Sequence, residues 1–344
     1  MSLDAAHHRA DSAKMLKSLS LQKGGDYDGA TVAAIVAGHM PLEPPPTLRH
    51  MRPMTLPIDH LVLPVGDLDA ARARLSALGF TVAPVGVHPF GTVNCCVYLQ
   101  GGTFLEPLAI GDRAAADAAI RAGNVFVARD RAFRDRQGAE GFSAVVFGTE
   151  NADADDRRFR TEQISAGAML QFSRPFVDAA GQTDTASFKL AFAAEPDAET
   201  AFFFACERVN APKVDRTALE CHTNGVSSLR GVVAVAEKPL EHSDFLRRLT
   251  GANAAADNAA GFDVAVGNST VVVVDPAVAK ARYGTAASTS AGLQLHATIF
   301  GVADPTAAEK LFKANAISYE RRDNRIIVPP APGQGTHFVF EAAT

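Results

Sequence analysis

The sequence predicts an α+β protein made of four βαβββ modules, paired into two domains behind an N-terminal arm. The order strand, helix, several strands recurs four times after about residue 55. One such unit leaves an apolar concave face that a second unit must cover, and 344 residues suffice for about two domains. We therefore expect an arm and linker at 1–54, domains at 55–210 and 226–344, and a connection at 211–225.

The first 54 residues differ from the rest in composition. They begin with a polar stretch and end near Pro44, Pro45 and Pro46, which favour extended polyproline structure and stop any helix. We expect a helical arm followed by a linker at 41–54. An arm of this kind can dock on a partner subunit, which sizing the protein with and without it would test.

The first module shows a strand followed by a helix. Leu68, Ala71, Leu75 and Leu78 recur at helical spacing, and Gly79 can supply the left-handed stop. A Gly101-Gly102 pair then suits a tight hairpin between two strands. The expected elements are a strand at 58–65, a helix at 68–78, and strands at 93–99 and 103–110.

The three later modules repeat this order with more divergence. For the second we expect a strand at 142–147, a helix at 150–166, and strands at 169–173, 187–193 and 201–206. For the third we expect a strand at 229–236, a helix at 243–249, and strands at 262–266 and 270–274. For the fourth we expect a strand from about 293, a helix at 306–314, and strands at 325–328 and 337–340.

Composition excludes several classes of protein. The formal net charge is −5 and the pI is about 6.1, so there is no basic excess to bind nucleic acid. No apolar run approaches the roughly 18 residues of a membrane span, and no signal peptide is visible. The 4 cysteines do not suggest a disulfide framework. We therefore expect a cytoplasmic protein with no nucleic-acid or membrane partner.

The first module also carries a specific motif. It contains Ile-Asp-His-Leu-Val-Leu-Pro-Val-Gly-Asp-Leu at 58–68, His-Pro-Phe-Gly-Thr-Val-Asn at 88–94 and Gly-Thr-Phe-Leu-Glu at 102–106. Together with His-Thr-Asn-Gly at 222–225, these segments resemble the glyoxalase-like proteins of the vicinal oxygen chelate superfamily. The resemblance implies two glyoxalase-like domains, each a cupped sheet with a divalent metal or a substrate at its centre.

An imidazole and two acids are the candidate metal ligands. Strand alternation allows His60 and Glu106 to point into the cup, and Glu207 takes the place of Glu106 in the second module. The predicted ligand set is therefore His60, Glu106 and Glu207, with Glu106 also acting in catalysis, and Zn, Fe, Mn and Ni are candidate metals. The structural alternative makes His60 a core histidine and the two acids strand-end surface charges.

The second module departs from the motif. Counting back seven residues from Glu150, as His60 lies seven before Asp67, gives Ser143, which is a poor metal ligand. We assign Ser143 to substrate binding, and loss of the metal remains an equal alternative. The second half has lost more of the pattern, and it can contribute stability, a homodimer surface or a lid.

Four further side chains are candidates for contact with a substrate. His88 and Asn94 flank a Gly91-Thr92 loop and can reach substrate oxygens. Arg174 can clamp a carboxylate with its planar fork, and His222 has a side chain whose ordinary pKa suits a general base. The structural alternatives are a turn for His88 and Asn94, a surface charge for Arg174, and a fixed interdomain turn for His222.

Two functions remain open at this point. The first is an enzyme that acts on a small oxygen-rich molecule, by isomerase, lyase or dioxygenase chemistry, with a divalent metal. The second is a metal-free protein that binds or sequesters a small molecule in the same cup.

Overall fold

The structure is a computed structural model. It describes residues 55–177, 183–195, 198–211, 215–252, 254–258, 260–285 and 292–343. The chain divides into two units, Met1–Arg52 and Pro53–Thr344, and every described residue belongs to the second. The predicted arm and linker at 1–54 therefore lie outside the described residues.

The first module begins with a buried strand and a capped helix. The side chain of Asp67 accepts a hydrogen bond from the backbone N–H of Ala70 at 2.8 Å, which satisfies a free donor at the start of the helix. The chain then returns through four shorter strands. The elements are β1 (Ile58–Pro64), α3 (Leu68–Ala77), β2 (Gly86–Val87), β3 (Thr92–Asn94), β4 (Val97–Tyr98) and β5 (Phe104–Ile110).

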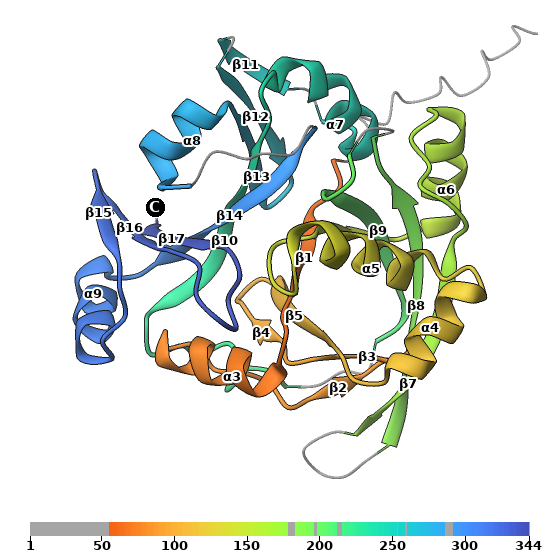
Figure 1. Ribbon diagram of the computed structural model, residues 1–344, viewed down its shortest axis with the longest axis horizontal. Coiled ribbons are helices and arrows are strands. Elements are labelled where there is room, and N and C mark those ends of the chain that lie inside the picture. Colours follow the sequence, from red (N-terminus) through yellow and green to blue (C-terminus); the bar gives the residue numbers. More distant parts are fainter. Residues whose placement is uncertain are drawn as a thin grey trace, which may run out of the picture. The chain divides into compact units, whose positions relative to one another are not determined.

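Two helices that the sequence analysis did not assign follow β5. They are α4 (Arg113–Arg121) and α5 (Val125–Gln137), capped by the side chains of Asp112 and Asn124. Phe126 at the start of α5 packs in one apolar cluster with Val62 of β1. The two helices therefore cover part of the concave face of the sheet (Figure 1).

The second module completes the first sheet. Its elements are β6 (Ala144–Thr149), α6 (Ala152–Thr161), β7 (Leu170–Val177), β8 (Thr183–Ala193) and β9 (Phe202–Asn210). The strand order is β2-β3-β5-β1-β6-β9-β8-β7, with β4 also paired to β5. β1 runs parallel to β5, β6 runs parallel to β9, and β1 and β6 meet antiparallel in the middle. The two modules thus contribute matching halves of one curved sheet.

The last two modules build a second sheet in the same manner. Their elements are β10 (Val226–Val235), a 3₁₀ turn η1 (Pro239–His242), α7 (Ser243–Thr250), β11 (Ala254–Asn258), β12 (Gly261–Val266), β13 (Ser269–Val274), α8 (Pro276–Tyr283), β14 (Gln294–Val302), α9 (Pro305–Ala314), β15 (Glu320–Arg322), β16 (Arg325–Val328) and β17 (His337–Ala342). The strand order is β11-β12-β13-β10-β14-β17-β16-β15. The predicted α+β fold of four repeated modules is confirmed.

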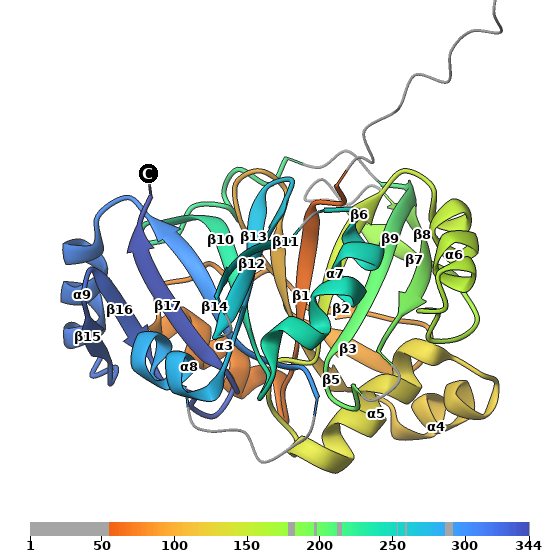
Figure 2. The same ribbon diagram turned by 90° about the horizontal axis from the view of Figure 1, so that it is seen from above.

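The convex sides of the two sheets share one hydrophobic core. Leu61 and Phe203 of the first sheet belong to the same buried cluster as Phe300 and Phe338 of the second. The Phe80 ring, just after α3, lies 5.4 Å from the Phe300 ring. Figure 2 shows the two sheets side by side with helices between and around them. The strands β9 and β10, on either side of the predicted connection at 211–225, therefore belong to one compact unit.

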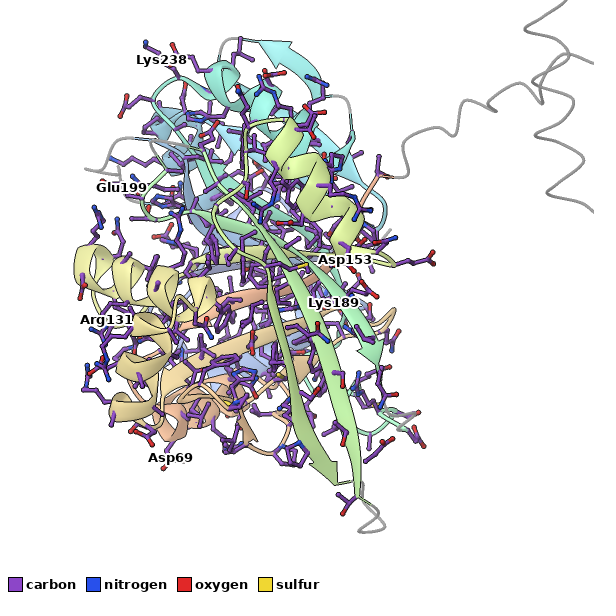
Figure 3. All side chains as sticks on the ribbon, turned by 90° about the vertical axis from the view of Figure 1, so that its right-hand side faces the viewer. Asp69, Arg131, Asp153, Lys189, Glu199 and Lys238 are labelled. Atoms are coloured by element: carbon purple, nitrogen blue, oxygen red, sulfur yellow. The ribbon has the colours of Figure 1, made fainter. Side chains whose placement is uncertain are left out.

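The outer surface of the first sheet is marked by charged pairs. Lys189 of β8 points away from the cup, and its Nζ lies 2.5 Å from Oδ2 of Asp153 on α6 (Figure 3). Because successive residues of a strand alternate in direction, its neighbours Phe188 and Leu190 face the concave side. None of the described helices is long and apolar enough to cross a membrane.

The concave faces differ between the sheets. We call the concave face of the β2-to-β7 sheet the first cup and that of the β11-to-β15 sheet the second cup. In the second cup Ala279 and Tyr283 of α8 pack on Val233, Val272 and other apolar side chains. The first cup contains a cavity.

Candidate functional site

The cavity of the first cup has a volume of about 110 Å³ and opens to solvent. This space can hold several water molecules or part of a small organic molecule. The apolar walls are formed chiefly by Phe90, Phe104, Phe126, Phe172, Phe188 and Phe204. An aromatic pocket with a few polar groups inside it has the usual character of a small-molecule site.

The polar groups of the cavity are arranged around Glu106. The side-chain amide of Asn94 donates to Glu106 Oε1 at 2.6 Å. Nε2 of His60 lies 3.5 Å from Glu106 Oε2, and Nε2 of His88 lies 3.7 Å from Oε1. All four side chains are buried. We call His60, His88, Asn94 and Glu106 the His–Glu cluster.

A β-bulge in β1 positions His60. The pairing of β1 with β6 shifts register between Ile58 and His60, which leaves Asp59 as the additional residue. Asp59 Oδ1 lies 2.6 Å from His60 Nδ1, and Arg208 donates to Asp59 Oδ2 at 2.7 Å. Burial would raise the pKa of Asp59, but the bonds to His60 and Arg208 hold it below its ordinary value. An ionised Asp59 therefore accepts a hydrogen bond from Nδ1–H of His60 and turns the Nε2 atom towards Glu106.

His88 comes from the turn between β2 and β3. Its Nδ1 is hydrogen-bonded to Thr92 Oγ1 at 2.8 Å, and its backbone N–H donates to the Thr92 carbonyl at 2.9 Å. Gly91 adopts a φ of +86°, which closes this turn. Burial lowers the pKa of His88 to about 4, so the imidazole is neutral at pH 7.

Two thiols in the cavity wall are unreactive at neutral pH. Burial raises the pKa of the Cys96 and Cys206 thiols well above the ordinary value. Because the thiolate is the reactive form, neither cysteine is a nucleophile at neutral pH.

Glu207 does not join the cluster. It pairs across β8 and β9 with Lys189, which points outward to α6. Glu207 Oε2 accepts a hydrogen bond from the Ala152 N–H at the start of α6, at 2.9 Å. The residues of β9 that face the cavity are its neighbours Cys206 and Arg208. The predicted ligand set therefore loses Glu207, because strand alternation turns it to the opposite face.

The second module contributes apolar groups to the cup. Its helix is capped by Asn151 and not by Glu150, so the position seven residues before the cap is Ala144. Phe204 pairs with Val146 as Glu106 pairs with Val62, which makes Phe204 the counterpart of Glu106. Ala144 and Phe204 thus replace a second His and Glu.

Ser143 lies outside the cavity that holds the His–Glu cluster. Its hydroxyl donates to the Val62 carbonyl at 3.4 Å, and its side chain lines a separate small cleft beside α5. The assignment of Ser143 to substrate binding came from the one-residue error in the helix cap. The structure gives this residue a place in the packing between β1 and β6.

His222 also lies outside the cavity lining. Its Nδ1 accepts from the Thr81 N–H at 3.0 Å, and its Nε2 is hydrogen-bonded to the Tyr98 carbonyl at 2.9 Å. Burial lowers its pKa. Both ring nitrogens are thus committed to the backbone, so His222 fixes the turn before β10 and does not serve as a general base.

Arg174 lines the cavity from β7, which is where a residue that binds a substrate is expected to lie. Sequence reasoning missed Asp59, Arg208 and Arg216, which line the cavity as well. The signal for Asp59 was an acid directly before the key histidine. Arg208 carried no such signal, because it contacts Asp59, a residue 149 positions earlier in the chain.

The donor atoms of the cluster suit a divalent metal in type. Imidazole nitrogens and a carboxylate are common ligands, and the Nδ1 atom of each histidine is held by a side-chain oxygen. Within the described ranges, no group of three or more His, Cys, Asp or Glu side chains is arranged closely enough to hold a metal ion. The cluster therefore has the chemistry of a ligand set without a closed ligand shell.

The comparisons with known proteins identify the architecture. The model of the glyoxalase-like domain family matches residues 58–250. A hypothetical protein from Staphylococcus aureus is similar with a TM-score of 0.59 at 14% identity, over 84% of this chain and 100% of that one. A mutant 4-hydroxymandelate synthase from Streptomyces coelicolor is similar with a TM-score of 0.53 at 13% identity, over 84% and 94%. A search of curated proteins finds no match.

Proposed function

The chain belongs to the glyoxalase-like domain family, within the vicinal oxygen chelate superfamily, and from this premise we propose an enzyme that acts on a small oxygen-rich molecule in the first cup. A divalent cation would be held by His60, His88 and Glu106. The observation that carries this proposal is the approach of two imidazole Nε2 atoms to the two oxygens of one buried carboxylate.

The residues in and around the His–Glu cluster have different roles. Asp59 and Thr92 hold the Nδ1 atoms of His60 and His88, so that both Nε2 atoms face the Glu106 carboxylate. Asn94 fixes the orientation of Glu106 through Oε1. A bound cation would supply Lewis acidity that polarises substrate oxygens. Glu106 then serves as the carboxylate that accepts a proton next to those oxygens.

Cation binding by the full chain tests the proposal. Protein treated with chelator and then dialysed should bind about one equivalent of Co²⁺, measured by calorimetry and by the visible absorption of the bound ion. His60→Ala, His88→Ala and Glu106→Gln should each weaken binding by about 10- to 100-fold or more, because each removes a ligand.

Glu207→Gln is the matched control, because it removes a carboxylate from the opposite face of β9. It should leave the affinity for Co²⁺ unchanged. Wild-type protein without saturable Co²⁺ binding, or a Glu207→Gln protein as defective as Glu106→Gln, would contradict the proposal.

The replacement of a second His and Glu by Ala144 and Phe204 favours one alternative function, a metal-free binding protein. In that case small apolar molecules would stabilise chelator-treated protein, and divalent cations would not. A ligand at 100 times its Kd raises the unfolding free energy by about 2.7 kcal/mol, which a thermal-shift screen detects.

A further inference from the structure

One arginine in the wall of the first cup has neither an ion pair nor a cation–π contact among the described residues. Arg174 lines the cavity from β7, and it forms no salt bridge within the part of the chain that the structure describes. The other two arginines of the wall are engaged. Arg208 binds Asp59 at 2.7 Å, and Arg216 lies over the Tyr98 ring at 4.4 Å. Arg174 is therefore the cation left free to meet a ligand.

The charges of the cavity wall favour an anion. Its three arginines face only two carboxylates, Asp59 and Glu106, and His88 is neutral. A half-buried guanidinium without a counter-ion is costly, so an anion that reaches it gains more than it would from an exposed arginine. A positive excess in a cavity also concentrates anions from solution.

Gly86 allows the guanidinium to reach the His–Glu cluster. A Cβ atom added at Gly86 would lie 2.4 Å from Asn94 Oδ1 and 2.5 Å from Arg174 Nη1. Both side chains therefore occupy the space that any larger residue at position 86 would fill. Arg174 thus reaches the edge of the cluster, next to the amide that holds Glu106.

The wall beside Arg174 is flat and aromatic. Phe172 is two residues away on the same strand face, and its ring stacks on that of Phe188 at 5.1 Å. The Phe90 ring meets Phe172 edge-on, also at 5.1 Å. A planar apolar body can pack against these rings from the cavity, where offset and edge-on contacts are favourable.

We propose that the ligand of the first cup is a small aromatic monocarboxylate, with its carboxylate bound by Arg174 and its ring among Phe90, Phe172 and Phe188. The inference rests on the proposed function, because it names the ligand class of the same cavity. The planar fork of arginine matches a carboxylate in two parallel hydrogen bonds. A single negative charge is preferred, because the Glu106 carboxylate shares the cavity.

Benzoate is the probe, and benzamide is its neutral isostere. Calorimetry on the full chain should show saturable benzoate binding, with benzamide at least about tenfold weaker, because the charge-assisted bonds are lost. Arg174→Gln should lower benzoate affinity by about tenfold or more, and Arg174→Lys should lower it less, because the charge remains. Gly86→Val should weaken it as well, because the added side chain displaces the guanidinium.

Arg113→Gln is the matched control, because Arg113 is an exposed arginine on α4 outside the cavity lining. It should bind benzoate as the wild type does. Equal affinity for benzoate and benzamide, unchanged binding by Arg174→Gln, or no benzoate binding to the wild type would overturn the proposal.

The same proteins separate this inference from the cation proposal. Arg174→Gln should still bind Co²⁺, because Arg174 supplies no cation ligand. If Arg174-dependent benzoate binding occurs in a wild type that binds no Co²⁺, the cation proposal fails and the carboxylate assignment stands. The reverse result, Co²⁺ binding without benzoate binding, removes only the carboxylate assignment.

Discussion

The two cups share a strand order and differ in what occupies them. In the first, buried polar side chains meet in a cavity between phenylalanine rings. In the second, α8 lies against the strands, with Tyr283 only 3% exposed and Ala279 fully buried. The same fold thus provides a binding cavity in one half and a packed core in the other.

The difference extends to single register positions. Ala297 lies seven residues before the Asp304 cap of α9, as His60 lies seven before Asp67. Two residues along, Val339 pairs with Ile299 in the way that Glu106 pairs with Val62. A βαβββ module therefore fixes where a side chain enters the cup, and the residue type decides whether that place is a ligand position or part of a core.

The largest effect on stability is expected from exchanging the residue types of Glu106 in the first cup and Val339 in the second. Val339→Glu places a carboxylate among the apolar side chains of the second cup without a partner, which should cost about 4 kcal/mol or more of unfolding free energy. Glu106→Val makes the opposite change in the first cup and should cost less, about 1–3 kcal/mol, because the buried Asn94 amide loses its acceptor. Urea unfolding measures both, and a Val339→Glu protein as stable as Glu106→Val would contradict the contrast.

A smaller loss is expected when the helix of the second cup is truncated. Tyr283→Ala should lower the unfolding free energy by about 3 kcal/mol, because it leaves a void under α8. Phe172→Ala removes a half-buried ring beside an existing cavity and should cost about 1 kcal/mol while weakening ligand binding. Equal losses of stability would show that the two cups are equally packed.

A bound cation should stabilise the protein through the first cup and not through the second. A divalent cation at 100 times its Kd should raise the unfolding free energy by about 2.7 kcal/mol, and chelator should remove the gain. His60→Ala should abolish this response, whereas His296→Ala in β14 should retain it. A gain that survives in His60→Ala would assign the cation to another part of the chain.

The smallest effect concerns acid stability in the second sheet. Burial, with the nearby His337, lowers the pKa of His296 to about 4. The unfolded chain then binds a proton more readily, so stability is present above about pH 6.5 and is lost as the pH falls towards 4. His296→Asn should flatten the stability profile over this window by about 1–2 kcal/mol. An unchanged profile in denaturant titrations at several pH values would contradict this assignment.

The repeated modules were predictable because their strands and helices follow clear periodicities. The helices α4, α5 and α8 were not assigned, although Asp112, Asn124 and Asp275 cap them in the usual way. Their place depends on the concave faces, which form only when strands far apart in the sequence pair. Local pattern therefore predicts the sheets better than it predicts what covers them.

For the site, the sequence placed His60, His88, Asn94 and Glu106 in the first module, and the structure brings them together. Glu207 was misplaced because alternation along β9 turns it to α6. The misplacement of Ser143 came from a one-residue shift, which reverses the face of every side chain in a strand. The contacts of His222 could not be anticipated, because they come from a distant turn.

The most direct test of the account is the position of a bound metal in the first cup. Crystals of the full chain grown with one equivalent of Co²⁺ should give an anomalous scattering peak between Nε2 of His60, Nε2 of His88 and the carboxylate of Glu106. A peak at any other position, or no peak from protein that binds Co²⁺ in solution, would contradict the assignment of the His–Glu cluster as the cation site.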